Sequence, residues 1–137
     1  MQTTILDQEL KSHFLNLYFL ALSDTQIDSE ELEMLFQLGQ NKGIAREEIE
    51  KIILRPDSIK FTIPQDTLTK IEYLYDYVTM ILADGRVDEH EELTLRKFCK
   101  KFGFEEQNIP VIMQYLIEEA TKGTDKKVII EQVKQAL

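Results

Sequence analysis

The chain has 137 residues, 43% of them hydrophobic, which is enough to bury the core of a single domain. Its 25 acidic and 16 basic residues give a formal net charge of −9, which argues against a nucleic-acid binder. The chain has no apolar run near the roughly 20 residues of a membrane-spanning helix, no secretion-signal pattern at its start, and a single cysteine, so we expect a cytoplasmic protein without direct membrane insertion.

Apolar residues at 3–4 spacing, with few glycines and prolines, predict an all-α bundle of about seven helices. The first three are expected at about 5–23, 29–42 and 46–54. The stretch 55–64 contains two prolines and is expected to be an extended link. Further helices are expected at about 66–83, from Asp88 to before Gly103, around 109–116, and at about 126–136.

The chain also resembles itself at an offset of 60 residues, without a gap between 22–53 and 82–113. The identical pairs are Leu22/Leu82, Asp24/Asp84, Asp28/Asp88, Glu31/Glu91, Leu35/Leu95, Gly43/Gly103, Ile49/Ile109 and Ile52/Ile112. This pattern predicts one compact domain over 1–137, built from two repeated three-helix units at about 5–54 and 66–120, plus the last helix. Gly43 and Gly103 should each end a helix in the left-handed conformation.

The stretch ADGRVDEHEE (83–92) has two interpretations. In the first, Asp88 caps a helix and Glu91, three residues later, completes a capping box. Asp28 and Glu31 repeat this spacing in the first unit. On this interpretation the acids only stabilise helix starts.

In the second interpretation the same acids bind a cation. With Asp84 at position 5 of a twelve-residue calcium loop, Asp88 falls at position 9 and Glu91 at position 12. Positions 1 and 3 are apolar, so a tight calcium site is not expected, and the prediction is a weak, partly hydrated Ca²⁺ or other divalent site. Asp24, Asp28 and Glu31 are weaker counterparts, because Thr25 replaces the loop glycine.

A helix that ends in Ala-Asp-Gly, followed by one that opens with Val-Asp-x-x-Glu, resembles the TerB-like family of tellurite-resistance and stress-response proteins. Residues 83–92 carry the motif, and SDTQIDSEE (23–31) is its degenerate partner. The resemblance implies a duplicated helical domain that binds divalent cations and a protein partner in a membrane-attached complex, without known catalysis. By position, Asp84 and Glu91 are the motif acids, with Asp24 and Glu31 as counterparts.

Other chemistry is weakly represented. Cys99 lies on an apolar stripe and is expected to be buried and inert. His13 and His90 are alone on their helices, and no nucleophile pairs with a base, so we expect neither enzyme activity nor a required cofactor. Most glutamates are expected on solvated helix faces. A basic run complements a helix end or meets an acidic partner or lipid head groups: Arg96, Lys97, Lys100 and Lys101.

The sequence therefore favours a non-enzymatic, cytoplasmic TerB-like module that binds a protein partner and a weak divalent cation at Asp84, Asp88 and Glu91. The alternative is a plain helical adaptor without metal, in which these acids serve only as helix caps.

Overall fold

The computed structural model describes residues 8–21, 29–58, 61–84 and 89–136. The regular structure in these ranges is entirely helical, so the all-α prediction is confirmed. The elements are α1 (Gln8–Ala21), α2 (Ser29–Asn41), α3 (Arg46–Leu54), η1 (Pro56–Ser58), α4 (Thr67–Ile81), η2 (Leu82–Asp84), α5 (Glu89–Lys101), α6 (Ile109–Thr121) and α7 (Lys126–Ala136).

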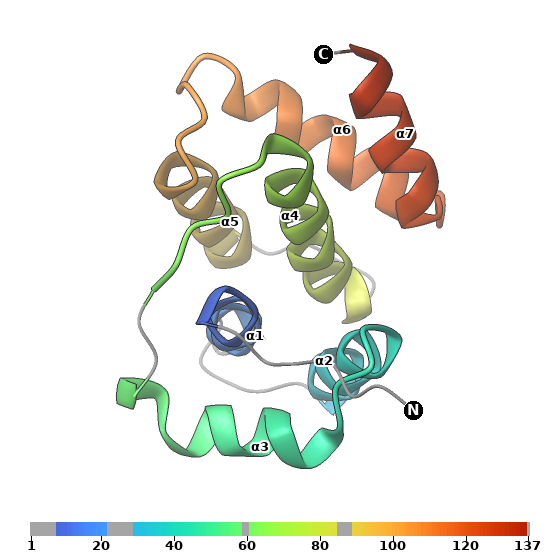
Figure 1. Ribbon diagram of the computed structural model, residues 1–137. Helices are drawn as coiled ribbons and strands as arrows, with labels where there is room; N and C mark the ends of the chain where they lie inside the picture. The colour runs from blue at the N-terminus through green and yellow to red at the C-terminus, as the bar shows by residue number, and fades with distance from the viewer. Residues whose placement is uncertain (1–7, 22–28, 59–60, 85–88, 137) are drawn as a thin grey trace.

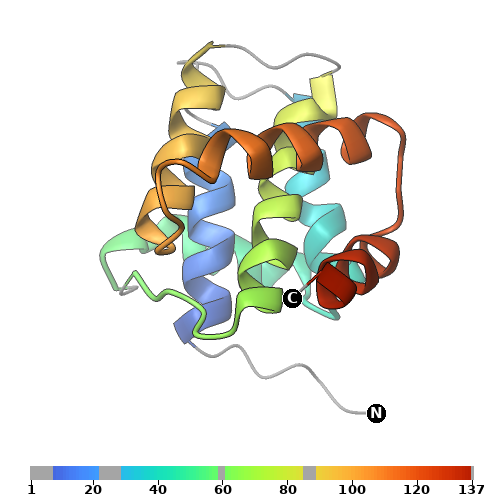
Figure 2. The same ribbon diagram turned by 90° about the horizontal axis from the view of Figure 1, so that it is seen from above.

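The helices stack around a middle layer that is itself a bundle of two helix pairs, α1 with α2 and α4 with α5 (Figure 1). The middle layer holds α1, α2, α4 and α5, and α3 packs across α1 and α2 on one side. On the other side, α6 packs across α4 and α5, while α7 contacts α4 (Figure 2). Crossing helices cover both faces of the middle layer, so its apolar side chains lose contact with water.

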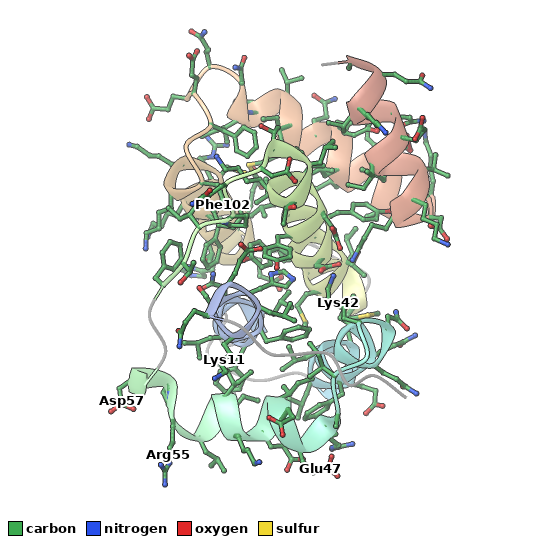
Figure 3. All side chains as sticks on the ribbon, in the orientation of Figure 1. Lys11, Lys42, Glu47, Arg55, Asp57 and Phe102 are labelled. Carbon is green, nitrogen blue, oxygen red and sulfur yellow. The ribbon has the colours of Figure 1, made fainter. Side chains whose placement is uncertain are left out.

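Helix α4 is the centre of the molecule, because it contacts α1, α2, α5, α6 and α7. Nine of its fifteen residues are buried, including Tyr73, Tyr75 and Tyr77. Phe102 reaches the same interior from the end of α5 (Figure 3) and is 1% exposed. Each fully buried aliphatic or aromatic side chain of this kind stabilises the fold by roughly 1.5–3 kcal/mol.

The apolar stripes of the sequence correspond to this core. The buried residues of these stripes include Phe14, Leu17, Leu35, Ile49, Ile71, Leu74, Val78, Leu95, Cys99, Ile109, Leu116 and Ile129. Leu10, Tyr18 and Val133, which lie on the same stripes, are partly buried and pack against the core.

Glycines end three helices in the same way. Gly43 and Gly103 have φ of 77° and 92°, as predicted, and Gly123 after α6 has 76°. The amide of Ile44 donates to the Gly39 carbonyl at 2.8 Å after the first of these turns. A side chain at these glycines would be strained, because L-residues rarely adopt positive φ.

Two boundary predictions need correction. The link 55–64 is not extended throughout, because Pro56–Ser58 forms the 3₁₀ turn η1. The long second-unit helix ends at Ile81 and tightens into η2, whereas the prediction continued it to residue 83. Its start agrees with the prediction, because Asp66 accepts a hydrogen bond from the Thr69 amide at 3.0 Å.

The 60-residue repeat stays a prediction, and equivalent positions are not packed alike. A Cβ atom on Gly39 would lie 2.3 Å from Ile49 Cδ1, so α2 and α3 approach closely there. The equivalent Cys99 is fully buried and its side chain fills space in the interior. None of the described helices is both long and apolar enough to cross a bilayer.

Candidate functional site

The predicted acidic motif lies only partly within the described residues. Asp84 is the last residue of η2, and Glu91 lies in the first turn of α5. The side chains of Asp84 and Glu31 are not described, and three further predicted ligands lie outside the described residues: Asp24, Asp28 and Asp88. Of the two acids that carry the family resemblance, only Glu91 therefore has a described side chain.

Glu91 differs from its neighbours on α5. It is 1% exposed, whereas Glu89 and Glu92 face solvent. The expectation of a solvated acidic face is wrong for this residue. A buried carboxylate at a helix start fits the capping box and the cation site alike, so both stay predictions. Among the described side chains, no three His, Cys, Asp or Glu residues are grouped so that they could hold a metal ion.

The most distinctive site among the described residues is a group of ionisable side chains around the buried Asp76, which we call the Asp76 cluster. Its members come from four segments of the chain: His13, Lys42, Glu72, Asp76 and Lys126. Glu72 and Asp76 lie four residues apart on α4 and therefore share one face of that helix. Lys42 follows the end of α2 and reaches toward α4 (Figure 3), while Lys126 is the first residue of α7.

Both oxygens of Asp76 have partners. His13 Nε2 donates to Asp76 Oδ2 at 2.8 Å, and Lys42 Nζ lies 3.4 Å from the same oxygen. Lys126 Nζ forms an ion pair with Asp76 Oδ1. Glu72 Oε1 accepts from Lys42 at 2.9 Å, so two carboxylates face two ammonium groups and the charges balance. A buried carboxylate requires such compensation.

These contacts set the protonation states. Burial would raise the pKa of Asp76, but the His13 hydrogen bond and the positive charges of Lys126 and Lys42 lower it to about 2. Burial lowers the pKa of His13, and this outweighs the opposite effect of Asp76. His13 Nδ1 has no hydrogen-bond partner among the described residues. A neutral ring that donates only from Nε2 leaves no buried N–H unsatisfied, so His13 is neutral and Asp76 is charged.

The histidine is also held by aromatic neighbours. Its ring stacks on Tyr73 at 3.8 Å between centroids and meets the edge of Phe14. Neither His13 nor Asp76 has any exposed side-chain surface. The pair has the form of a base and its orienting acid, but the ring is closed off from solvent. The cluster therefore links α1, the end of α2, α4 and the start of α7 through side-chain contacts to Asp76.

One face of the cluster borders a cavity. Lys42, Glu72 and Lys126 line an open groove of about 760 Å³ together with Asp125 and Lys127. Three lysines and two carboxylates therefore line it, and Lys42 and Lys126 are already paired with Glu72 and Asp76. An incoming ion would have to replace these pairs.

A second groove lies at the surface between α5 and the start of α6. It has a volume of about 540 Å³ and is lined by Leu93, Arg96, Lys97, Lys100, Glu106, Gln107 and Ile109. Three of these residues are cations, in a chain whose formal net charge is −9. Only Lys100 and Lys101 lie in the last turn of α5, so the helix end does not account for Arg96 and Lys97.

Sequence reasoning missed the Asp76 cluster, although two signals were present. Asp76 interrupts the apolar stripe of α4, between Leu74 and Val78. Lys126 opens a helix, where the positive end of the helix dipole disfavours a cation. Both residues break a local rule, and each compensates the other in the fold. The prediction for Cys99 holds, because the thiol is fully buried and burial raises its pKa to about 12.

Comparison with protein-family models, with characterised proteins and with solved structures finds no significant match. The function therefore has to be argued from the residues of this chain.

Proposed function

We propose that the chain is a non-catalytic helical module that binds a protein partner at the groove between α5 and α6. The observation that carries the proposal is the groove itself, which combines a half-exposed Leu93 with three cations. Protein interfaces are built around an apolar centre with a charged rim. Leu93 and the aliphatic parts of Arg96 and Lys100 supply both components on one helix.

The contrast with the Asp76 cluster supports the non-catalytic part of the proposal. His13, which is held by a carboxylate, is buried and lines neither groove. The thiol of Cys99 is buried as well, and its raised pKa keeps it protonated and unreactive at neutral pH. Neither group can reach a bound substrate without opening the core.

The biological setting comes from the TerB-like resemblance. It implies a stress response of the tellurite-resistance type and a partner that belongs to a membrane-attached complex, while the single cysteine suggests the cytoplasm. A weak divalent cation at Asp84, Asp88 and Glu91 is the second part of the proposal, and the burial of Glu91 agrees with it as well as with a capping box. Thermal unfolding after chelation, with and without Ca²⁺ or Mg²⁺, tests it, and the Asp84→Asn variant should lose any stabilisation.

Site-specific photo-crosslinking in the native cell tests the binding function. In one variant of the full chain a photoreactive residue replaces Leu93. In a second variant of the same chain it replaces Leu54, which is 78% exposed at the end of α3. The two positions lie in different layers of the fold (Figure 1). We expect a discrete adduct from position 93 and none above background from position 54. Equal labelling from both positions would contradict the proposal.

A further inference from the structure

We propose that the α5–α6 groove takes an acidic amphipathic segment of a partner protein. This inference rests on the proposed function and adds the chemistry of the partner. It is carried by the stripe that α5 presents to the groove, namely Leu93, Arg96, Lys97 and Lys100.

The spacing of these four residues defines the shape of the partner. They occupy positions i, i+3, i+4 and i+7 of one helix, so they form a single straight stripe. The stripe begins with an apolar side chain and continues with cations. A segment that places an apolar residue and then carboxylates at helical spacing matches it along its length.

The cations of the stripe are available to a partner. Arg96 Nη2 lies 3.8 Å from Glu92 Oε1, and about half of each side chain is exposed. Lys100 Nζ lies 3.6 Å from Glu106 Oε1, and both of these side chains are more exposed still. Such pairs contribute little and exchange readily. Lys97 has no ion-pair or hydrogen-bond partner in the described part of the chain. A carboxylate placed over Lys97 and Lys100 would therefore gain interactions without first breaking a buried pair.

The form of the groove distinguishes among anionic partners. Ile109, 2% exposed, forms the base of the groove where α6 starts, and α6 then crosses above α5 (Figure 2). A concave site of about 540 Å³ accepts a protruding chain better than the flat surface of a bilayer. The formal charge of −9 on the whole molecule repels the long phosphate backbone of a nucleic acid. A short acidic segment contacts only the local basic stripe.

Fluorescence anisotropy with a labelled, designed peptide tests the inference on the full chain. The peptide is an amphipathic helix with leucine at position i and glutamate at i+3, i+4 and i+7, and a matched peptide carries glutamine in place of each glutamate. We expect saturable binding of the glutamate peptide, weaker binding of the glutamine peptide, and a loss of affinity as salt rises.

Protein variants locate the binding site. Lys97→Glu should weaken binding of the glutamate peptide by roughly fivefold, since exposed charge pairs are worth up to about 1 kcal/mol. Leu93→Ser should also weaken it. Lys134→Glu on α7 makes the same change in net charge at an exposed position far along the chain and should leave binding unchanged. Equal losses in Lys97→Glu and Lys134→Glu would overturn the inference, because they would show a response to net charge alone.

Two other outcomes separate the inference from the proposed function. If the glutamine peptide binds as well as the glutamate peptide, and Lys97→Glu has no effect, the acidic partner is wrong while a crosslink at position 93 still supports the module. If vesicles with anionic lipid bind in a Lys97-dependent way and the peptide does not, the groove recognises a membrane and the inference fails. Absence of both peptide binding and the crosslink would overturn the inference and the proposed function together.

Discussion

The Asp76 cluster and the α5–α6 groove use the same kinds of residue in opposite ways. In the cluster, Lys42 and Lys126 face two carboxylates, one of them fully buried. In the groove, Lys97 and its neighbours face solvent, and the nearest carboxylates are mostly exposed. The comparison shows that the charge of a lysine does not decide its role. The carboxylates that the fold brings to it, and their access to water, decide that role.

The difference follows from where each region lies in the layers. Asp76 sits in the middle of α4, which is covered by helices on several sides, so its charge must be compensated inside the protein. Leu93 and Lys97 lie on the outer side of α5, where water already solvates a charge and an apolar side chain stays 49% exposed. The first region should therefore control stability, and the second should control binding.

Removal of the buried carboxylate should have the largest effect. Asp76→Ala leaves Lys42 and Lys126 facing each other and His13 without an acceptor, so we expect a loss of about 3 kcal/mol in the free energy of unfolding. Urea unfolding measures it, with an unchanged m-value as the sign that the native fold is kept. Asp57→Ala, at an exposed position in η1, is the control and should change stability by less than about 0.5 kcal/mol. A similar small loss in Asp76→Ala would show that the cluster does not hold the helices together.

Acid should weaken the same region in two steps. The pKa of His13 is lower in the folded chain than its ordinary 6.5. Below pH 6.5 the unfolded chain therefore binds a proton that the folded chain does not, and the free energy of unfolding decreases as the pH is lowered. The pKa of Asp76 is about 2 in the folded chain, compared with its ordinary 3.8, so the folded chain loses further stability as the pH is lowered from 3.8 to about 2. That second loss is roughly 2 kcal/mol for a shift of this size.

The His13→Gln variant separates the two steps. Glutamine can still donate a hydrogen bond to Asp76 but does not titrate, so the first step should disappear while the second remains. Urea midpoints measured from neutral pH downward test this. A first step of unchanged size in the variant would show that another group causes it.

The sequence predicts the parts of this molecule that follow from repeating local patterns. The stripe of α4, its start near residue 66 and the left-handed turn at Gly43 each depend on residues within a few positions of one another. The Asp76 cluster could not be predicted in this way. His13 and Asp76 are 63 positions apart, and nothing local to either residue specifies that the other will face it. The α5–α6 groove is only partly predictable. The basic run can be recognised in the sequence, but its position beside α6 cannot.

The smallest expected changes in stability come from replacing single lysines in the two regions. Lys126→Met removes one of the two ammonium groups that face Asp76, so the buried negative charge is only partly compensated. We expect the free energy of unfolding to fall by about 1–2 kcal/mol. Lys97→Met, in the groove, should stay within about 0.5 kcal/mol of the parent chain. Lys127→Met is the matched control for Lys126, because it is next in the same helix and exposed.

Thermal or urea unfolding of the three variants gives the comparison directly, and methionine keeps the helical propensity and most of the side-chain volume of lysine. Equal losses at 126 and 127 would assign the effect to the start of α7 and not to the ion pair. A loss at 97 as large as that at 126 would mean that the basic stripe stabilises the folded chain. Its cations would then no longer be free to meet a partner, and the distinction between the two regions would not hold.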